Sequence, residues 1–244
     1  MIERVIESAI LNDFLRKKVI VLLGARQVGK TTLLESLRKK GQKVFSVNCD
    51  DMDDVLLIEE KTSTELRALL APYDLVFIDE AQRVKNIGLT LKKIGDLKLD
   101  TQVVVTGSSS LELADEVNEP ATGRLIEYRL FPFSLSELAT HTSEREEQRM
   151  LEQRLIYGLY PEVVTFPGDA KRTLMTLANN YLYKDLFSYR GLKKPDVLQK
   201  LLRALALQLG SEVSYNELSN LLGVDKETVE NYINLLEKCF VVFR

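Results

Sequence analysis

The stretch that decides the fold runs Val19-Ile-Val-Leu-Leu-Gly24-Ala-Arg-Gln-Val-Gly29-Lys30-Thr31-Thr-Leu-Leu34. Its first five residues are apolar and three of them are β-branched, which predicts a strand buried on both faces. The middle part fits G-x-x-x-x-G-K-S/T at every fixed position, and the last part begins an apolar helical pattern. A strand, a glycine-rich loop and a helix therefore follow one another in the order that a phosphate-binding loop requires.

The residue types of this loop suit a triphosphate. The two glycines let the backbone turn tightly, so that N–H groups face the phosphates, and the following helix adds its positive end. We expect Lys30 at the β- and γ-phosphates and Thr31 on Mg²⁺. Arg26 is expected either to face the phosphates or to brace the loop through an ion pair, for example with Glu80. The residues expected to bind the nucleotide are Gly24, Ala25, Arg26, Gln27, Val28, Gly29, Lys30, Thr31 and Thr32.

Strand and helix patterns alternate along the first half of the chain. Further strands are predicted at 43–49, 74–78, 103–105 and 126–130, with helices at 1–16, 30–40, 64–70 and 89–95. Such alternation predicts parallel βαβ units with right-handed crossovers and helices on both sheet faces. The predicted fold class is therefore α/β, a P-loop NTPase with a parallel sheet flanked by helices.

Two acids follow the third predicted strand. The apolar run Leu75–Ile78 places Asp79 and Glu80 at the carboxyl end of a buried strand, where α/β folds collect their ligands. We expect Asp79 to hold Mg²⁺ through water and Glu80 to polarise the attacking water as general base. An acidic pair that simply ends a strand is the alternative, and the upstream P-loop favours the functional interpretation.

Two further sites could sense the nucleotide. Ser108 or Ser109, after the fourth predicted strand, is expected to contact the γ-phosphate or the attacking water, although the same stretch can also cap a helix. Arg124 follows a glycine and is expected to stabilise transition-state charge, in its own subunit or in a neighbour's site. An ordinary surface arginine is the competing interpretation.

Composition sets the remaining limits. The 244 residues carry a net charge of −3, so no global charge attracts nucleic acid or anionic lipid. Cys49 and Cys239 lie far apart in apolar stretches and are expected to be reduced, buried thiols. The N-terminus lacks the basic start and apolar run of a signal peptide, and no segment approaches the length of a membrane span. We therefore expect a cytoplasmic protein without a membrane partner.

The region after Pro132 is predicted to be helical. Helices are expected at 134–138, 144–149, 170–188, 196–209, 214–221 and 225–238. The last two read as a helix-turn-helix, with Ser214 and Asp225 or Thr228 as caps and Gly223 at the turn. Residues 225–238 contain two lysines and four acids, a net charge of −2. Because phosphate contacts need positive charge, DNA binding is not favoured, and a protein partner or homo-oligomer is preferred.

The motifs resemble those of the uncharacterised AAA+ superfamily ATPases of bacteria and archaea. The similar segments are Gly24–Leu34, Asp79-Glu-Ala-Gln82, Thr106-Gly-Ser-Ser-Ser110, Gly123-Arg124 and Leu130-Phe-Pro-Phe-Ser-Leu-Ser-Glu137. The resemblance spans nearly the whole chain. It implies an ASCE-type sheet order, an α-helical lid, a winged helix, and Arg124 as the finger or sensor arginine. The predicted domains are a P-loop core at 1–132, a helical lid and linker at 133–192, and an incomplete winged-helix-like segment at 193–244.

The end of the sequence departs from that family. The chain stops after residues 240–244, where a winged helix would enter its wing, and the family's further C-terminal domain of unknown function does not follow. We expect a truncated gene product or a piece of a longer protein.

The predicted function is Mg²⁺-dependent ATP binding and hydrolysis by an AAA+-type ATPase that couples nucleotide state to conformational change. ATP and Mg²⁺ are the expected cofactors. ATP over GTP rests on the resemblance and on the lack of an N-K-x-D-type guanine signature. The alternative is a nucleotide-gated DNA-binding or signalling module with weak turnover. A small-molecule phosphotransferase shares the P-loop, but Glu80 directly after Asp79 argues against it.

Overall fold

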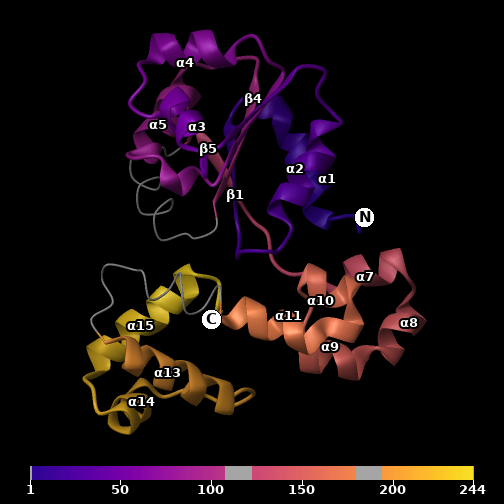
Figure 1. The fold of residues 1–244 in the computed structure, drawn as a ribbon, viewed down its shortest axis with the longest axis vertical. Coiled ribbons are helices and arrows are strands. Elements are labelled where there is room, and N and C mark those ends of the chain that lie inside the picture. Colours follow the sequence, from indigo (N-terminus) through magenta and orange to yellow (C-terminus); the bar gives the residue numbers. More distant parts are fainter. Residues whose placement is uncertain (1, 108–122, 180–193, 244) are drawn as a thin grey trace. The chain divides into compact units, whose positions relative to one another are not determined.

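The computed structural model describes residues 2–107, 123–179 and 194–243. The chain forms two compact units, residues 1–171 and 172–244, which are described separately (Figure 1). The first unit contains the whole sheet together with the helices up to residue 165.

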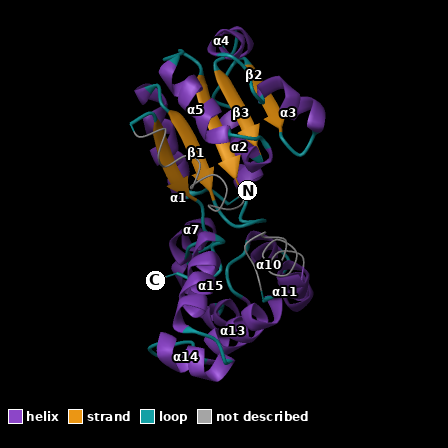
Figure 2. Ribbon diagram, turned by 90° about the vertical axis from the view of Figure 1, so that its left-hand side faces the viewer, coloured by secondary structure: helices purple, strands orange, loops and turns teal. Residues whose placement is uncertain are grey.

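A five-stranded parallel sheet forms the centre of the first unit. Its strands lie in the order β2 (Val44–Asn48), β3 (Leu75–Asp79), β4 (Gln102–Gly107), β1 (Val19–Leu23) and β5 (Leu125–Arg129) (Figure 2). All four neighbouring pairs are parallel. The α/β class and the ASCE-type order are thereby confirmed, because β4 lies between the P-loop strand β1 and the acidic strand β3.

Helices cover both faces of this sheet. Figure 1 shows α1 (Val5–Asp13) and α2 (Lys30–Arg38) on one side, with α4 (Ser63–Leu70) and α5 (Ile87–Asp96) on the other. Every residue of β1 and β4 is buried, whereas the edge strands β2 and β5 are partly exposed. Fully buried side chains from both helical layers, among them Ile10, Leu37 and Leu91, complete the core.

The structure contains one short helix before β3 that was not predicted, and it describes only part of a longer helix that was predicted. A short helix, α3 (Met52–Ile58), was not predicted; it begins after Asp51, whose side chain accepts a hydrogen bond from the N–H of Asp53. The helix predicted over 170–188 is present as α11 (Ala170–Leu177), and its part from residue 180 onward lies outside the described residues.

Four short helices follow the sheet within the first unit. They are α7 (Leu135–His141), α8 (Glu144–Arg149), α9 (Leu151–Tyr157) and α10 (Pro161–Thr165). A buried pair joins two of them, since Arg154 of α9 donates to Glu147 of α8 from Nε at 2.9 Å and from Nη2 at 3.1 Å. These two hydrogen bonds between the guanidinium and the carboxylate offset the free-energy cost of desolvating both charges.

The second unit contains α13 (Pro195–Leu207), α14 (Tyr215–Leu222) and α15 (Lys226–Lys238). The predicted turn and caps of the helix-turn-helix are confirmed. Gly223 has φ +64°, the side chain of Ser214 caps α14, and Asp225 accepts from the N–H of Thr228. Within residues 194–243 only helices and loops are found, so the winged helix stays a prediction. No helix in the described parts of the chain has the length and apolarity to cross a membrane.

Candidate active site

The phosphate loop joins the end of β1 to the start of α2, and its two glycines serve different purposes. A Cβ on Gly24 would lie 2.3 Å from the carbonyl oxygen of Leu130, so a glycine is needed for close approach of two backbones. Gly29 has φ +97° and precedes the first residue of α2, where only a glycine is unstrained. Gln27 also has a positive φ, of 61°, so the loop stores backbone strain.

Lys30 is folded into this loop. Lys30 is buried, with only 6% of its surface exposed. Its Nζ donates to the carbonyl oxygens of Gly24 at 2.9 Å and Ala25 at 3.0 Å. Burial lowers the pKa of Lys30, while the carboxylates of Glu80 and Asp79 oppose that shift. The ammonium group is thus placed inside the loop with two acids close enough to act on its charge.

The loop and the third strand meet at Asp79. The Thr31 hydroxyl donates to Oδ2 of Asp79 at 3.3 Å, and the N–H of Glu80 donates to Oδ1 at 3.1 Å. The hydroxyl of Thr106, at the end of β4, also donates to Oδ1 and accepts from the N–H of Glu80 at 3.3 Å. Sequence reasoning missed Thr106, although a polar residue after Val103–Val105 on a central strand was a detectable signal.

Glu80 is the second acid, and its conformation is unusual. It is half-buried, with φ +53°, a conformation that costs a non-glycine residue free energy and is concentrated at functional sites. Gln82 donates from Nε2 to its Oε2 at 2.5 Å. The carboxylate is therefore held in one orientation by the short 3-10 helix that follows β3.

The donor set of Thr31 and Asp79 fits a magnesium ion. Mg²⁺ prefers oxygen ligands, retains several waters, and takes only one or two protein groups beside the phosphates. Across the described ranges no three acids, histidines or cysteines cluster as for an all-protein metal site. The hydroxyl of Thr31 and the carboxylate of Asp79, beside a phosphate loop, match a magnesium site of one or two protein ligands.

A family described as an AAA domain matches residues 16–139, just over half of the length, and includes the P-loop, Asp79 and Glu80. The chain belongs to the AAA domain family. Residues 148–244 match a second family, described as a Domain of unknown function (DUF8612). The resemblance to uncharacterised AAA+ P-loop ATPases is thereby confirmed.

Several relatives of this AAA domain protein bear the name uncharacterized protein. An uncharacterized protein of Haemophilus influenzae is 25% identical over 260 residues, which cover 95% of this chain and 62% of that protein. Uncharacterized protein MJ1637 of Methanocaldococcus jannaschii is 25% identical over 281 residues, covering 98% and 58%. The chain thus spans about three fifths of the length of these relatives. Among solved structures, the replication initiator DnaA bound to AMPPCP and single-stranded DNA aligns with a TM-score of 0.41 and 16% identity, covering 94% of this chain and 86% of that one.

The AAA domain does not bring Arg124 to its own phosphate loop. Arg124 precedes β5, accepts from the N–H of Val19 through its carbonyl, and pairs with Asp96 through its guanidinium. Since β5 and β1 are parallel, Arg124 lies at the opposite end of the sheet from the P-loop, roughly 16 Å away along a five-residue strand. Action within its own subunit is therefore not supported, and action on a neighbour's site remains a prediction.

The remaining predicted residues have mixed outcomes. Arg26 is exposed in the loop, and its charge contributes to the lowered pKa of Lys30. Ser108 and Ser109 lie outside the described residues. Thr32 is exposed on the first turn of α2. Both cysteines are buried, as predicted.

Proposed function

We propose that this AAA domain protein binds ATP with Mg²⁺ and hydrolyses it. The observation that carries the proposal is the convergence of Lys30, Thr31, Asp79 and Glu80 at the carboxyl edge of one parallel sheet, with Thr31 and Asp79 in hydrogen-bond contact. The cytoplasmic location and the boundaries at 132 and 192 are part of the same proposal.

Each group has a distinct task in this mechanism. The loop N–H groups and Lys30 bind the phosphates, and Lys30 exchanges its carbonyl partners for phosphate oxygens. Thr31 and Asp79 would hold a magnesium ion, which would neutralise negative charge on the phosphates. Glu80 orients the attacking water and accepts its proton, while Gln82 keeps the carboxylate in place.

The same geometry offers a path from the loop to the helices that follow. The N–H of Leu130 donates to the carbonyl of Leu23 at 2.7 Å, and the Leu130 carbonyl lies against Gly24. The chain then continues directly into α7. A shift of the phosphate loop on hydrolysis would therefore displace the segment before α7, and we propose this as the route by which nucleotide state changes conformation.

Two substitutions test the proposal. Lys30→Ala should abolish the binding of ATP and ADP measured by calorimetry, because the phosphate charge loses its buried partner. Glu80→Gln should retain binding and lower kcat for phosphate release by about 100-fold or more, the usual effect of removing a general base. Lys40→Ala and Glu152→Gln change exposed residues of the same types and serve as matched controls.

The outcomes separate the proposal from its alternative. Turnover that does not depend on Glu80, or binding that survives Lys30→Ala, contradicts the ATPase proposal. Tight, Lys30-dependent binding with negligible turnover would instead favour a nucleotide-gated module.

A further inference from the structure

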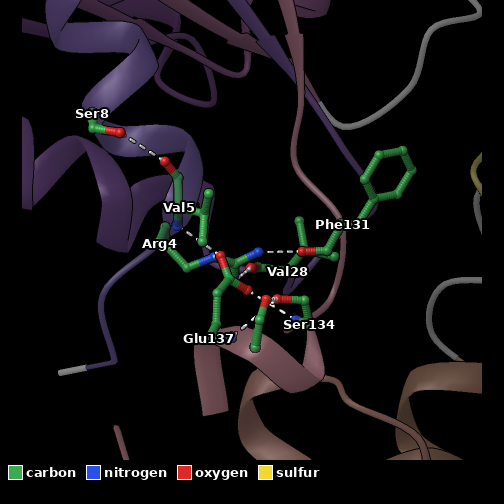
Figure 3. Close-up of polar contacts among 8 residues, drawn as sticks. Arg4, Val5, Ser8, Val28, Phe131, Ser134 and Glu137 are labelled. Carbon is green, nitrogen blue, oxygen red and sulfur yellow. Dashed lines mark hydrogen bonds and ion pairs between the residues drawn. The ribbon is translucent and has the colours of Figure 1, made fainter. Parts of the chain in front are cut away.

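Arg4 reaches the phosphate loop from outside the P-loop motif. It precedes α1 and donates from Nη1 to the carbonyl oxygen of Val28 at 3.2 Å and from Nη2 to that of Phe131 (Figure 3). Its Nε lies 3.2 Å from Oε1 of Glu137, and its guanidinium carbon lies 4.6 Å from the ring centroid of Phe133. The side chains of Arg4 and Glu137 are both more than nine-tenths buried.

The contact with Val28 fixes the orientation of a loop peptide. The bond between Val28 and Gly29 is trans, so the Val28 carbonyl and the Gly29 N–H lie in one plane and point in opposite directions. Arg4 binds the Val28 carbonyl, whereas Lys30 binds the loop carbonyls of Gly24 and Ala25. The Gly29 N–H, which points the opposite way, is therefore directed away from the Arg4 guanidinium.

We propose that Arg4 is a positioning residue of this site: it fixes the Val28–Gly29 peptide so that the Gly29 N–H donates to a nucleotide phosphate. The inference rests on the nucleotide binding proposed above. Arginine suits this task because its planar fork serves the Val28 carbonyl, the Phe131 carbonyl and Glu137 at once, which a lysine ammonium on a flexible stem does not.

Glu137 holds Arg4 in place. Its Oε1 also accepts from the N–H of Val5 at 2.9 Å, and its Oε2 accepts from the N–H of Ser134 at 2.9 Å (Figure 3). The buried guanidinium therefore has a counter-charge that is itself fixed at the start of α7. The positioning of the loop depends on a helix that lies more than 100 residues further along the chain.

The test observes the Gly29 amide directly. Val28-Gly29 is the only Val-Gly pair in the sequence, so labelling valine carbonyl carbon and glycine nitrogen gives a single amide resonance for Gly29. In Arg4→Lys this resonance should move in the free protein, and its shift on adding MgADP should fall to less than half. The KM for ATP should rise about 10-fold, as for a lost hydrogen bond to a charged group, with a smaller change in kcat.

Arg16→Lys is the matched control, because Arg16 is an exposed arginine of the same N-terminal segment and pairs with Asp13 within one turn. Arg4→Lys with a wild-type Gly29 shift and KM overturns the inference. If Arg4→Lys does not fold, Glu137→Gln decides, since it keeps the shape and removes the counter-charge: a displaced Gly29 resonance supports the inference, and an unmoved one overturns it. Failure of wild-type protein to bind MgADP would instead reject the proposed function.

Discussion

At the scale of single residues, Asp79 is the best-organised group of the site. It accepts hydrogen bonds from the Thr31 hydroxyl, the Thr106 hydroxyl and the N–H of Glu80. These donors come from α2, from β4 and from the turn after β3, so three separate elements fix one carboxylate. A group oriented in this way needs little reorganisation when a metal ion and phosphates arrive, which is the physical basis of preorganised binding.

Gly24 gives a residue-scale prediction about stability. Gly24→Ala places a methyl group 2.3 Å from the Leu130 carbonyl oxygen, and this oxygen belongs to the backbone, so it cannot move aside cheaply. We expect the free energy of unfolding to fall by about 2 kcal/mol or more, measured by urea denaturation, because overpacking forces a backbone shift. Gly168→Ala is the control, since a Cβ there meets nothing within 4 Å, and equal stability of the two variants would disprove the account.

At the scale of elements, the pairing of α8 with α9 shows how short helices are held. Neither helix exceeds seven residues, which is too short to be stable alone. The fork between Glu147 and Arg154 joins them, and the hydroxyl of Thr142 donates to Glu147 as well. The hydrogen bond from Arg154 is the main cause that lowers the pKa of Glu147 below its ordinary value of 4.5.

Removing one member of this pair should be costly. We expect Arg154→Met to lower the free energy of unfolding by about 3 kcal/mol, because it leaves a buried carboxylate unpaired. Arg149→Met removes a 63% exposed arginine that pairs with Glu146 across one turn, and should change stability by about 1 kcal/mol at most. Similar losses in the two variants would contradict this ranking.

The pair of Glu147 and Arg154 also makes the free energy of unfolding depend on pH. Unfolded Glu147 takes up its proton near pH 4.5, whereas the folded carboxyl does so only at lower pH. The contribution of the pair is therefore complete above about pH 4.5 and is lost as the pH falls through the lowered pKa. Denaturation of wild type and Arg154→Met between pH 3 and 7 should show the difference in stability shrinking toward the acid end.

The elements also show what sequence can predict. The central strands were predictable because burial on both faces demands continuous apolar runs such as Val19–Leu23. The helix α3 was missed because it is short and follows a run of acids. The end of the sheet at which Arg124 lies could have been deduced from the sequence. Arg124 precedes a predicted parallel strand, whereas the P-loop follows one, so the two lie at opposite ends. The contact of Arg4 with Val28 left no local pattern, because it joins segments through tertiary structure alone.

At the scale of the whole molecule, the two compact units have separate cores. Buried side chains such as Ile20 and Val104 belong to the first unit, and Leu198, Leu218 and Leu236 to the second. Every residue proposed to contact the nucleotide lies in the first unit. A ligand that binds one folded unit stabilises that unit directly by mass action.

Calorimetric unfolding should therefore resolve two transitions that respond differently to nucleotide. At an MgADP concentration of 100 times Kd, the first unit should gain about 2.7 kcal/mol, which raises its Tm by roughly 5–10 °C. The transition of the second unit should move by much less. In Lys30→Ala neither transition should respond to MgADP. If MgADP raises the Tm of both transitions equally in the wild type, the unfolding of the two units is coupled and this prediction is wrong.

The place of β1 in the sheet has a consequence for biosynthesis. Although β1 is made early, both of its hydrogen-bonding partners come later, β4 ending at Gly107 and β5 at Arg129. Until Gly107 has left the ribosome both edges of this fully apolar strand are open, and the edge that pairs with β5 stays open until Arg129 has emerged. Chaperone capture of early nascent chains, and a sharp gain in their solubility once residue 129 has emerged, follow from this order of synthesis.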